Sequence, residues 1–370
     1  MACSSPSVAA KPTPSPVASP TPSPSPPPCV QPVARPVASG VTSANPLLQL
    51  ATGLNGPDDL LYTDDGTVLV GEHTDGHLAR VGGTAGLARL PQVIPEAEGI
   101  AQVNGTTYIA DQFHARVVAL TDTGMRTLIQ LQPVASGENL DGMSSNLKGD
   151  GLIVPDSPHG TVLQVDLSGK VVSRVGGFVR PAGAAPDPSA GGYLIADENA
   201  SAVFELTGGT VKRLAGGLSG VDDAIRTDTG HVLVILPASG RLFDVTAGAN
   251  LATGLRNPQG LGFDGAQNVL VTESDNGRLD LVVTTFAITT PPPNVQLAPG
   301  QPICYGLVRS PGFADAVTIQ EVVNGMPLVD PAGDAPGQLV PGRCDQPSCT
   351  VTLILKSGAK LAYAWITYRS

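Results

Sequence analysis

A repeat of about 40 residues runs through most of this 370-residue chain and constrains its fold more than any other feature. In each copy a loop leads into a short strand, a Gly-containing turn and an apolar strand, which an acidic residue usually follows. The six apolar strands begin at Val68, Tyr108, Leu152, Tyr193, Val232 and Val269. Short runs of Val, Ile and Leu indicate strands that are buried on both faces. The repeat therefore predicts an all-β fold, a six-bladed β-propeller with one four-stranded sheet per copy.

The two ends of the repeat array predict how the ring closes. Residues 50–54 (LATGL), before the first repeat, are identical to residues 251–255, before the sixth. The sixth repeat ends near Phe286 and lacks an outermost strand of its own. We therefore expect residues 47–50 to pair there as an N-terminal strand, which would remove the exposed sheet edges.

The flanking segments predict two further domains. Residues 1–40 are rich in Pro, Ser, Thr and Ala and form a disordered stalk, because such a tract cannot bury enough apolar surface to fold. The propeller spans residues 41–288. After a Pro-rich linker, residues 289–370 carry strand-like runs and predict a small β-sandwich-like module, with Trp365 in its core.

Composition and the N-terminus predict where the protein works. A net charge of −11 repels a phosphate backbone, so nucleic acid is not an expected partner. Cys3, ahead of the stalk, resembles the lipidated cysteine of a bacterial lipoprotein whose signal peptide has been removed. The alternative is an ordinary disordered tail with a chance cysteine. We expect an extracytoplasmic monomer, secreted or attached to the membrane through lipid only, since no apolar run approaches the roughly 20 residues that span a bilayer.

The other cysteines fit an exported protein. Cys29, Cys304, Cys344 and Cys349 are even in number and predict disulfides, whose pairing the sequence leaves open. No histidine pair stands at metal-ligand spacing beside Cys344 and Cys349, so a structural zinc site is not expected.

Two positions of each repeat should surround the central channel on one face of the propeller. The position that leads into the first strand, which we name the first ring, holds Asp58, Glu98, Asp141, Ala182, Asp222 and Gln259. Asp59 and Asp223 follow two of these residues where other blades have Gly. The position after the second strand, the second ring, holds Glu72, Asp111, Asp156, Asp197, Leu236 and Glu273.

The rings predict an acidic ligand-binding mouth. Nine of the 12 ring positions are carboxylates in a chain with only 14% charged residues. Such groups repel each other unless a cation binds, their pKa values rise, or hydrogen bonds neutralise them. The predicted ligand-binding residues are Asp58, Asp59, Glu72, Asp111, Asp156, Asp197, Asp222, Asp223 and Glu273. The alternative, capping of loop N–H groups without chemistry, applies most to the second ring.

Several motifs resemble a known superfamily. Residues 193–197 (YLIAD), 257–261 (NPQGL) and 268–273 (NVLVTE) are similar to six-bladed propellers of the NHL-repeat and gluconolactonase/senescence-marker-protein group. The resemblance covers about residues 45–287 and indicates the fold but no particular chemistry.

The lactonase branch of that group implies a metal. Its members hold one divalent cation through a Glu, an Asn and an Asp, and residues 140–143 (LDGM) look like the loop that presents the Asp. The resemblance makes Asp141 and Glu98 metal ligands, and the ring positions add Asp58 and Asp222. The Asn ligand has no match in the first ring. The resemblance therefore supports Ca²⁺ or another divalent metal more than it supports a lactonase.

Histidines offer a second route to chemistry. His73, His114 and His159 lie in equivalent turns, where a histidine beside carboxylates can act as a general base or a metal ligand. The candidate catalytic residues are His73 and Asp141. Solvated turn histidines are the alternative. The sequence lacks nucleophile-elbow, zinc-protease, phosphate-loop and dinucleotide motifs, so no nucleotide or organic cofactor is expected.

These features predict a binding protein for a small molecule or an extracellular protein, which acts at its acidic, calcium-binding mouth. A metal-dependent hydrolase of the lactonase type is the first alternative. A structural module that makes contacts through its C-terminal domain is the second.

Overall fold

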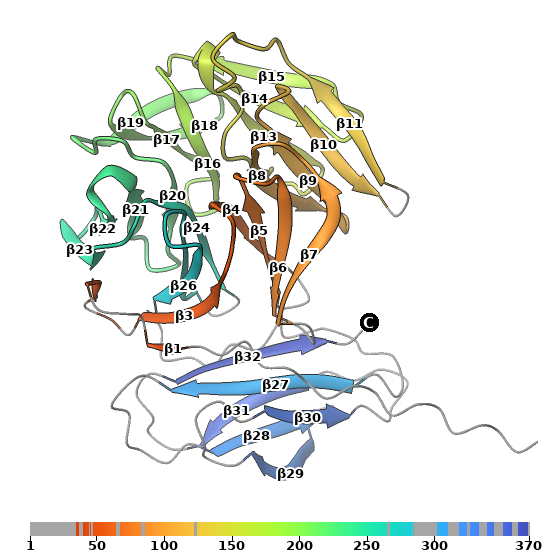
Figure 1. The fold of residues 1–370 in the computed structure, drawn as a ribbon. Coiled ribbons are helices and arrows are strands. Elements are labelled where there is room, and N and C mark those ends of the chain that lie inside the picture. The colour runs from red at the N-terminus through yellow and green to blue at the C-terminus, as the bar shows by residue number, and fades with distance from the viewer. Residues whose placement is uncertain are drawn as a thin grey trace, which may run out of the picture.

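The structure is a computed structural model that describes residues 35–36, 40–43, 45, 47–63, 67–82, 86–121, 124–264, 267–282 and 284, together with the backbone of six strands between 302 and 368. Six antiparallel sheets stand around a central axis, and they confirm the predicted six-bladed β-propeller (Figure 1). Side chains of the strands beyond residue 302 are not described.

The first three blades each use four strands that are consecutive in the chain. Blade 1 contains β4 (Pro57–Tyr62), β5 (Val68–Glu72), β6 (His77–Gly82) and β7 (Gly86–Val93). Blade 2 contains β8 (Ala97–Val103), β9 (Thr106–Asp111), β10 (Arg116–Thr121) and β11 (Gly124–Gln130). Blade 3 contains β12 (Ser144–Ser145), β13 (Gly151–Asp156), β14 (Thr161–Asp166) and β15 (Val171–Gly176).

The last three blades repeat this order, and the final two take strands from the N-terminus. Blade 4 contains β16 (Pro181–Asp187), β17 (Gly192–Asp197), β18 (Ala202–Thr207) and β19 (Thr210–Gly216). Blade 5 contains β20 (Ala224–Arg226), β21 (Val232–Leu236), β22 (Arg241–Asp244), β23 (Ala249–Thr253) and β2 (Thr42–Ser43). Blade 6 contains β24 (Pro258–Phe263), β25 (Val269–Glu273), β26 (Arg278–Val282), β3 (Leu47–Thr52) and β1 (Arg35–Pro36).

The second strand of each blade is almost entirely buried. Every residue of β5, β13, β21 and β25 is buried, as the short apolar runs predict. By contrast, the outermost strands β15 and β19 are largely exposed. Fully buried side chains such as Leu69, Leu194 and Leu233 pack between neighbouring blades, and each stabilises the fold by about 1.5–3 kcal/mol.

The ring closes through the N-terminal strand, as predicted. β3 pairs with β26 as the fourth strand of blade 6, and Figure 1 shows the two ends of the propeller sequence side by side there. Leu54 N–H donates to Gly277 O at 3.1 Å, and Leu255 N–H donates to Gly240 O at 3.1 Å. These are equivalent bonds of the two LATGL segments. Identical sequences thus end the fourth strands of blades 5 and 6, and the short strands β2 and β1 pair outside them.

Beyond the propeller, the backbone forms two three-stranded antiparallel sheets. One contains β27 (Pro302–Arg309), β30 (Leu339–Arg343) and β32 (Ala362–Tyr368), and the other contains β28 (Thr318–Val323), β29 (Met326–Ala332) and β31 (Val351–Lys356). The predicted domain boundaries at residues 40 and 288 stay predictions. The lipidation of Cys3 and the disulfides among Cys29, Cys304, Cys344 and Cys349 fall on side chains outside the described residues.

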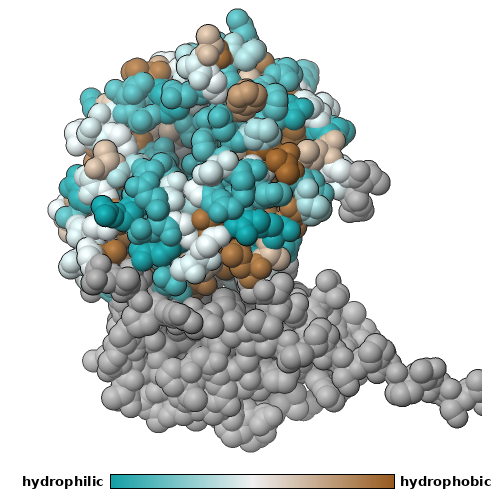
Figure 2. All heavy atoms as spheres, viewed as in Figure 1, coloured by the Kyte–Doolittle hydropathy of each residue, from teal (hydrophilic) through white to brown (hydrophobic). Residues whose placement is uncertain are grey.

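Two surface properties bear on function. No helix among the described residues is long and apolar enough to cross a bilayer. Hydrophilic residues predominate on the propeller face in Figure 2, and apolar residues are scattered among them.

Candidate functional site

A β-bulge at the start of five blades builds most of the first ring. In β4, Pro57 pairs with Glu72 and Leu60 pairs with Val70, so Asp58 and Asp59 together face one residue of β5. The same shift occurs in β8, β16 and β24, and the bridge from Leu140 to Asp156 ahead of β12 repeats it. In blade 5, Asp222 and Asp223 directly precede β20. Bulges re-aim side chains at the ends of sheets, and here each presents two consecutive residues at the channel.

The structure brings the four predicted metal ligands into one acidic group. Asp58 and Glu98 each feel the negative charge of Asp141, and Glu98 also feels that of Asp222. Glu98 is 4% exposed and Asp141 9% exposed, whereas Asp58 and Asp222 are half-buried. The first ring is therefore a compact set of carboxyl groups at the channel mouth.

Two of these acids converge with a histidine closely enough to hold an ion. Asp58, His73 and Glu98 each offer a ligand atom, and these atoms all lie within 4.8 Å of one another. His73 Nδ1 lies 2.6 Å from Glu98 Oε1, and the carboxyl group of Asp58 lies beside that of Glu98. The His73 side chain is 41% exposed and covers the buried carboxyl of Glu98 from the solvent side. We name these three residues the mouth triad.

Burial makes the two carboxyl groups of the mouth triad difficult to ionise. The pKa of Asp58 is raised well above its ordinary value by burial and then by the charge of Glu98. The pKa of Glu98 is raised in the same way, by burial and then by Asp141. Two buried carboxylates beside each other repel, so this pair favours a bound proton or a cation.

A second carboxyl pair joins blades 1 and 5. Asp59 of blade 1 interacts with Asp223 of blade 5, and burial raises the pKa of both. Asp223 Oδ2 also accepts a hydrogen bond from Leu261 N–H at 3.2 Å. A Cβ atom on Gly183 would overlap Asp223, and one on Gly260 would overlap the backbone of Asp58. The glycines that other blades carry at this position thus leave the space that the two aspartates fill.

Arg180 supplies a cation that sequence reasoning missed. Its Nη1 lies 3.1 Å from Asp141 Oδ2 and also contacts Glu198. Burial raises the pKa of Asp141 to about 6, although the Arg180 charge lowers it. The sequence did contain a signal for this residue. Arg180 stands two positions before Ala182, in the blade where alanine replaces the first-ring acid. Asp141 therefore has a permanent counter-ion, which Asp58 and Glu98 lack.

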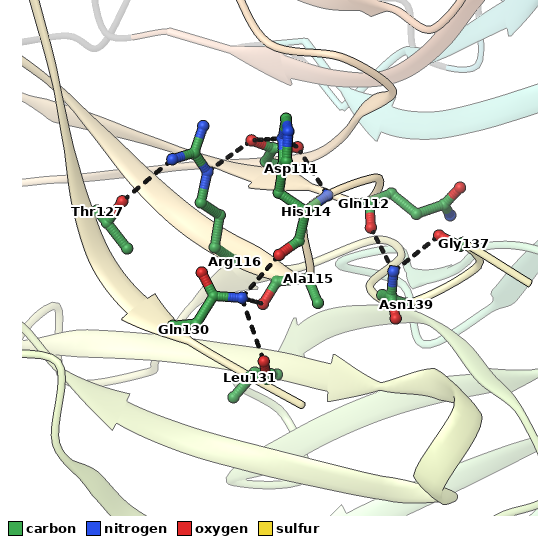
Figure 3. A network of polar contacts seen from close by, with 10 residues as sticks. All are labelled: Asp111, Gln112, His114, Ala115, Arg116, Thr127, Gln130, Leu131, Gly137 and Asn139. Carbon is green, nitrogen blue, oxygen red and sulfur yellow. Dashed lines mark hydrogen bonds and ion pairs between the residues drawn. The ribbon is translucent and has the colours of Figure 1, made fainter. Parts of the chain in front are cut away.

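Buried amides hold the loop that carries Asp141. Gln112 Nε2 donates to Leu140 O at 2.8 Å. Asn139 Nδ2 donates to Gln112 O at 2.9 Å (Figure 3). Asn139 Oδ1 accepts a hydrogen bond from Val134 N–H at 2.6 Å. Gln112 and Asn139 are 7% and 2% exposed. Sequence reasoning also missed these two residues, because an amide that serves as a loop support has no pattern of its own.

Arginines and backbone N–H groups neutralise the second ring. Figure 3 shows Asp111 between Arg116, whose Nε lies 2.7 Å from Oδ2, and His114. Glu72 receives hydrogen bonds at 2.7 Å from Nε and Nη2 of Arg89.

The remaining three acids of this ring follow the same principle. Asp156 contacts His159 and Arg174. Asp197 accepts from the N–H groups of Val179, Arg180 and Ala200, and Glu273 accepts from Arg256 N–H and pairs with Arg278. These contacts match the alternative considered from the sequence, in which the second-ring acids cap loop N–H groups and pair with nearby cations. A ligand-binding role for the five acids stays a prediction.

The three turn histidines differ in their partners. His114 Nδ1 lies 2.9 Å from Asp111, and His159 Nδ1 lies 2.6 Å from Asp156. Both partners are acids of the second ring in the same turn. Only His73 reaches an acid of the first ring, Glu98. His73 and Asp141, the predicted catalytic candidates, are thus both placed at the channel mouth.

Comparison with known proteins supports the fold. No family model and no curated protein matches the chain. A gluconolactonase from Xanthomonas campestris is 14% identical, with a TM-score of 0.53 over 67% of this chain and 94% of its own. Regucalcin, a calcium-binding protein from Agrobacterium tumefaciens, is 13% identical, with a TM-score of 0.51 over 65% of this chain and 93% of its own. Virginiamycin B lyase from Staphylococcus aureus is 12% identical, with a TM-score of 0.50 over 66% of this chain and 99% of its own.

Proposed function

We propose that the propeller binds a divalent cation at the mouth triad and uses this centre to bind a small-molecule ligand. The observation that carries the proposal is the convergence of ligand atoms of Asp58, His73 and Glu98 within 4.8 Å of one another. Similarity in fold to gluconolactonase and regucalcin propellers is consistent with a cation at this place.

The donor set fits a divalent cation. Two carboxyl groups supply oxygen ligands, which Ca²⁺, Mg²⁺ and Mn²⁺ prefer, and the imidazole adds a nitrogen ligand that suits Zn²⁺ and other transition metals. The raised pKa values of Asp58 and Glu98 support a cation here, because positive charge would stabilise both groups as carboxylates. The sequence favoured Ca²⁺, whereas the imidazole widens the choice.

Thermal unfolding and titration calorimetry with Ca²⁺, Mg²⁺, Mn²⁺ and Zn²⁺ test the cation. We expect at least one ion to raise the stability saturably, by about 2.7 kcal/mol at 100 times its Kd. Glu98→Gln should weaken binding at least tenfold, because losing even an outer partner of a metal site costs roughly this much.

Asp228→Asn is the matched control. Asp228 is an exposed acid in the turn between β20 and β21, so its loss removes the same charge far from the mouth. The control should bind the cation as the unchanged protein does. Equal Kd values for Glu98→Gln and Asp228→Asn, or no saturable shift with any of the four ions, would refute the cation site.

Hydrolysis of a lactone is the second candidate, and Asp141 favours it. A carboxyl group with a pKa of about 6 exchanges protons near neutral pH, as a general base must. Arg180 contacts this carboxyl and holds it in place, and the adjoining loop is supported by Gln112. When bound, a cation supplies a Lewis acid to such a site.

A panel of lactones, with proton release as the readout, separates binding from catalysis. Under the hydrolase proposal, turnover is lost with a chelator and falls by about 100-fold or more in Asp141→Asn. Turnover that Asp141→Asn leaves unchanged would remove this residue from the mechanism. Cation binding without turnover of any lactone would leave the binding function alone.

An extracytoplasmic, lipid-anchored location is part of the proposal and depends on the sequence of residues 1–40. Metabolic labelling with a fatty acid should mark the chain, and Cys3→Ser should abolish the label. A third function, contacts made through residues 289–370, predicts that partner capture is lost when these residues are deleted and kept when the mouth triad is changed.

A further inference from the structure

A cleft between blades 5 and 6 lies on the same face as the channel mouth but apart from its carboxyl groups. The cavity has a volume of about 790 Å³, within the range of small-molecule sites. Its walls come from η2 (Pro237–Ser239), the loop from Gly254 to Asn257, the turn at Asp275 and Asn276, and the N-terminal residues Gly40 and Val41. Polar groups predominate in this lining.

Two arginines line the cleft. Arg256 is exposed, and its guanidinium forms no ion pair with any residue that the structure describes. Arg278 is 7% exposed, and its Nε is buried without a hydrogen-bond partner. Its guanidinium contacts the buried Glu273. Asp280, 3.6 Å from Arg278, adds little negative charge, because burial and Glu273 raise its pKa to about 9.

A third arginine, Arg241, reaches the wall of the cleft because blade 5 has leucine in place of the second-ring acid. Arg116 and Arg278 open their strands opposite Asp111 and Glu273, and each pairs with that acid. Arg241 holds the same position in blade 5 but lies opposite Leu236. Its Nε donates to Ser239 Oγ, which lines the cleft, at 2.9 Å. Leucine at this one ring position thus leaves Arg241 without the carboxylate partner of its equivalents.

We propose that this cleft binds a small organic anion that carries two or more carboxylate or phosphate oxygens. Arg256 and Arg278 contact the anion, and Arg241 adds positive charge from the wall. Asn257 and Asn276 supply further polar groups for its remaining oxygens. Guanidinium groups suit this ligand because their paired N–H donors match the geometry of carboxylates and phosphates. Asp275 is the one acid among the described lining residues, and Glu273 already pairs with Arg278, so the excess positive charge comes from Arg256 and Arg241.

Calorimetric titration of the full chain, stripped of divalent cations, with citrate and with inorganic phosphate tests the proposal. Sodium chloride keeps the ionic strength constant, so general screening produces no signal. We expect saturable binding of at least one probe. Citrate alone would identify a carboxylate ligand and phosphate alone a phosphorylated one.

Variants locate the binding. Arg256→Gln should weaken it about tenfold, the usual loss for a hydrogen bond to a charged group. Arg213→Gln removes the same charge from the exposed strand β19 and should leave binding unchanged. Leu236→Glu gives Arg241 the acid that its equivalents have and should also weaken binding, with folding checked by thermal unfolding.

Two results would overturn the proposal. One is the absence of saturable binding by either probe beyond the effect of chloride. The other is an equal Kd for Arg256→Gln and Arg213→Gln. Because Arg256 is exposed and makes no side-chain ion pair among the described residues, its replacement tests the cleft without breaking the fold.

Discussion

The two rings of carboxylates lie on one face of the propeller but are neutralised in opposite ways. Glu72 of the second ring ends a regular strand and receives two hydrogen bonds from Arg89. Asp58 and Glu98 of the first ring lie on bulges, and their partners are each other and His73. A buried carboxylate is stable when the chain supplies its cation; otherwise it retains a proton or binds an ion.

The pKa values express this difference. Burial tends to raise the pKa of Glu273 in the second ring, but its interactions with Asp280, Arg278 and the Arg256 N–H outweigh burial and lower the value. In the first ring burial and repulsion act together, so the pKa of Asp222 is raised well above its ordinary value. The second ring therefore stabilises the fold, and the first ring stores an unfavourable energy that a ligand can relieve.

The largest effect should follow from removing a cation of the second ring. Arg89→Met leaves the fully buried Glu72 with one backbone donor, Asn55 N–H, and should lower the free energy of unfolding by about 2–3 kcal/mol. Urea unfolding measures this loss. Arg213→Met, on an exposed strand, should change the stability by less than about 0.5 kcal/mol. If both variants were equally stable, the second ring would not be a structural device.

Removing an acid of the first ring should have the opposite sign. Asp222→Asn relieves repulsion with Asp141 and Asp58 and should raise the free energy of unfolding by about 1 kcal/mol at pH 8. Asp228→Asn serves as the control, since it lies in an exposed turn.

The same repulsion sets the pH dependence of the cation-free protein. A carboxyl group whose folded pKa lies above its unfolded value binds more protons in the folded state, so stability falls as pH rises between the two values. For Asp141 this window runs from 3.8 to about 6, and for Asp280 it extends to about 9. Urea unfolding from pH 4 to 9 should show this decline, and a saturating cation should flatten it. Stability that rises through this range would contradict the assignment.

The smallest effect separates two histidines that look alike in sequence. His73→Ala and His114→Ala each remove a half-exposed partner of an acid, so each should cost only about 0.5 kcal/mol. The cation Kd should rise in His73→Ala alone, because His114 contacts Asp111 of the second ring. Equal Kd values for the two variants would exclude His73 as a ligand.

Much of the fold could be predicted because its signals are local. The apolar strands from Val68 to Val271 alternate with turns at a fixed spacing, and the two LATGL segments reveal the closure. The positions of both rings followed from the same alignment. The bulges did not, because a register shift between Pro57 and Leu60 depends on how β4 meets β5 and leaves no mark in composition.

The site was harder to predict, since its contacts join residues that are distant in the chain. Asp141 meets Arg180 of another blade, and Asp59 of blade 1 meets Asp223 of blade 5. The sequence identified Asp59 and Asp223 as exceptions at positions where other blades have glycine, but it could not show that the two residues meet. Sequence reasoning also missed Asn139 and Gln112, whose amide hydrogen bonds become meaningful only when the Asp141 loop is folded.

The sequence by itself determined six blades, the closing strand and the placement of carboxylates on one face, because strand burial and turn formation depend on neighbouring residues. Only the tertiary structure decided which carboxylates receive an arginine and which are left to a proton or a cation. Glu72 has Arg89 within 2.7 Å, whereas Asp58 and Glu98 lie beside like charges. Charge interactions depend on distance and burial in three dimensions, so the chemistry of the mouth follows from its geometry.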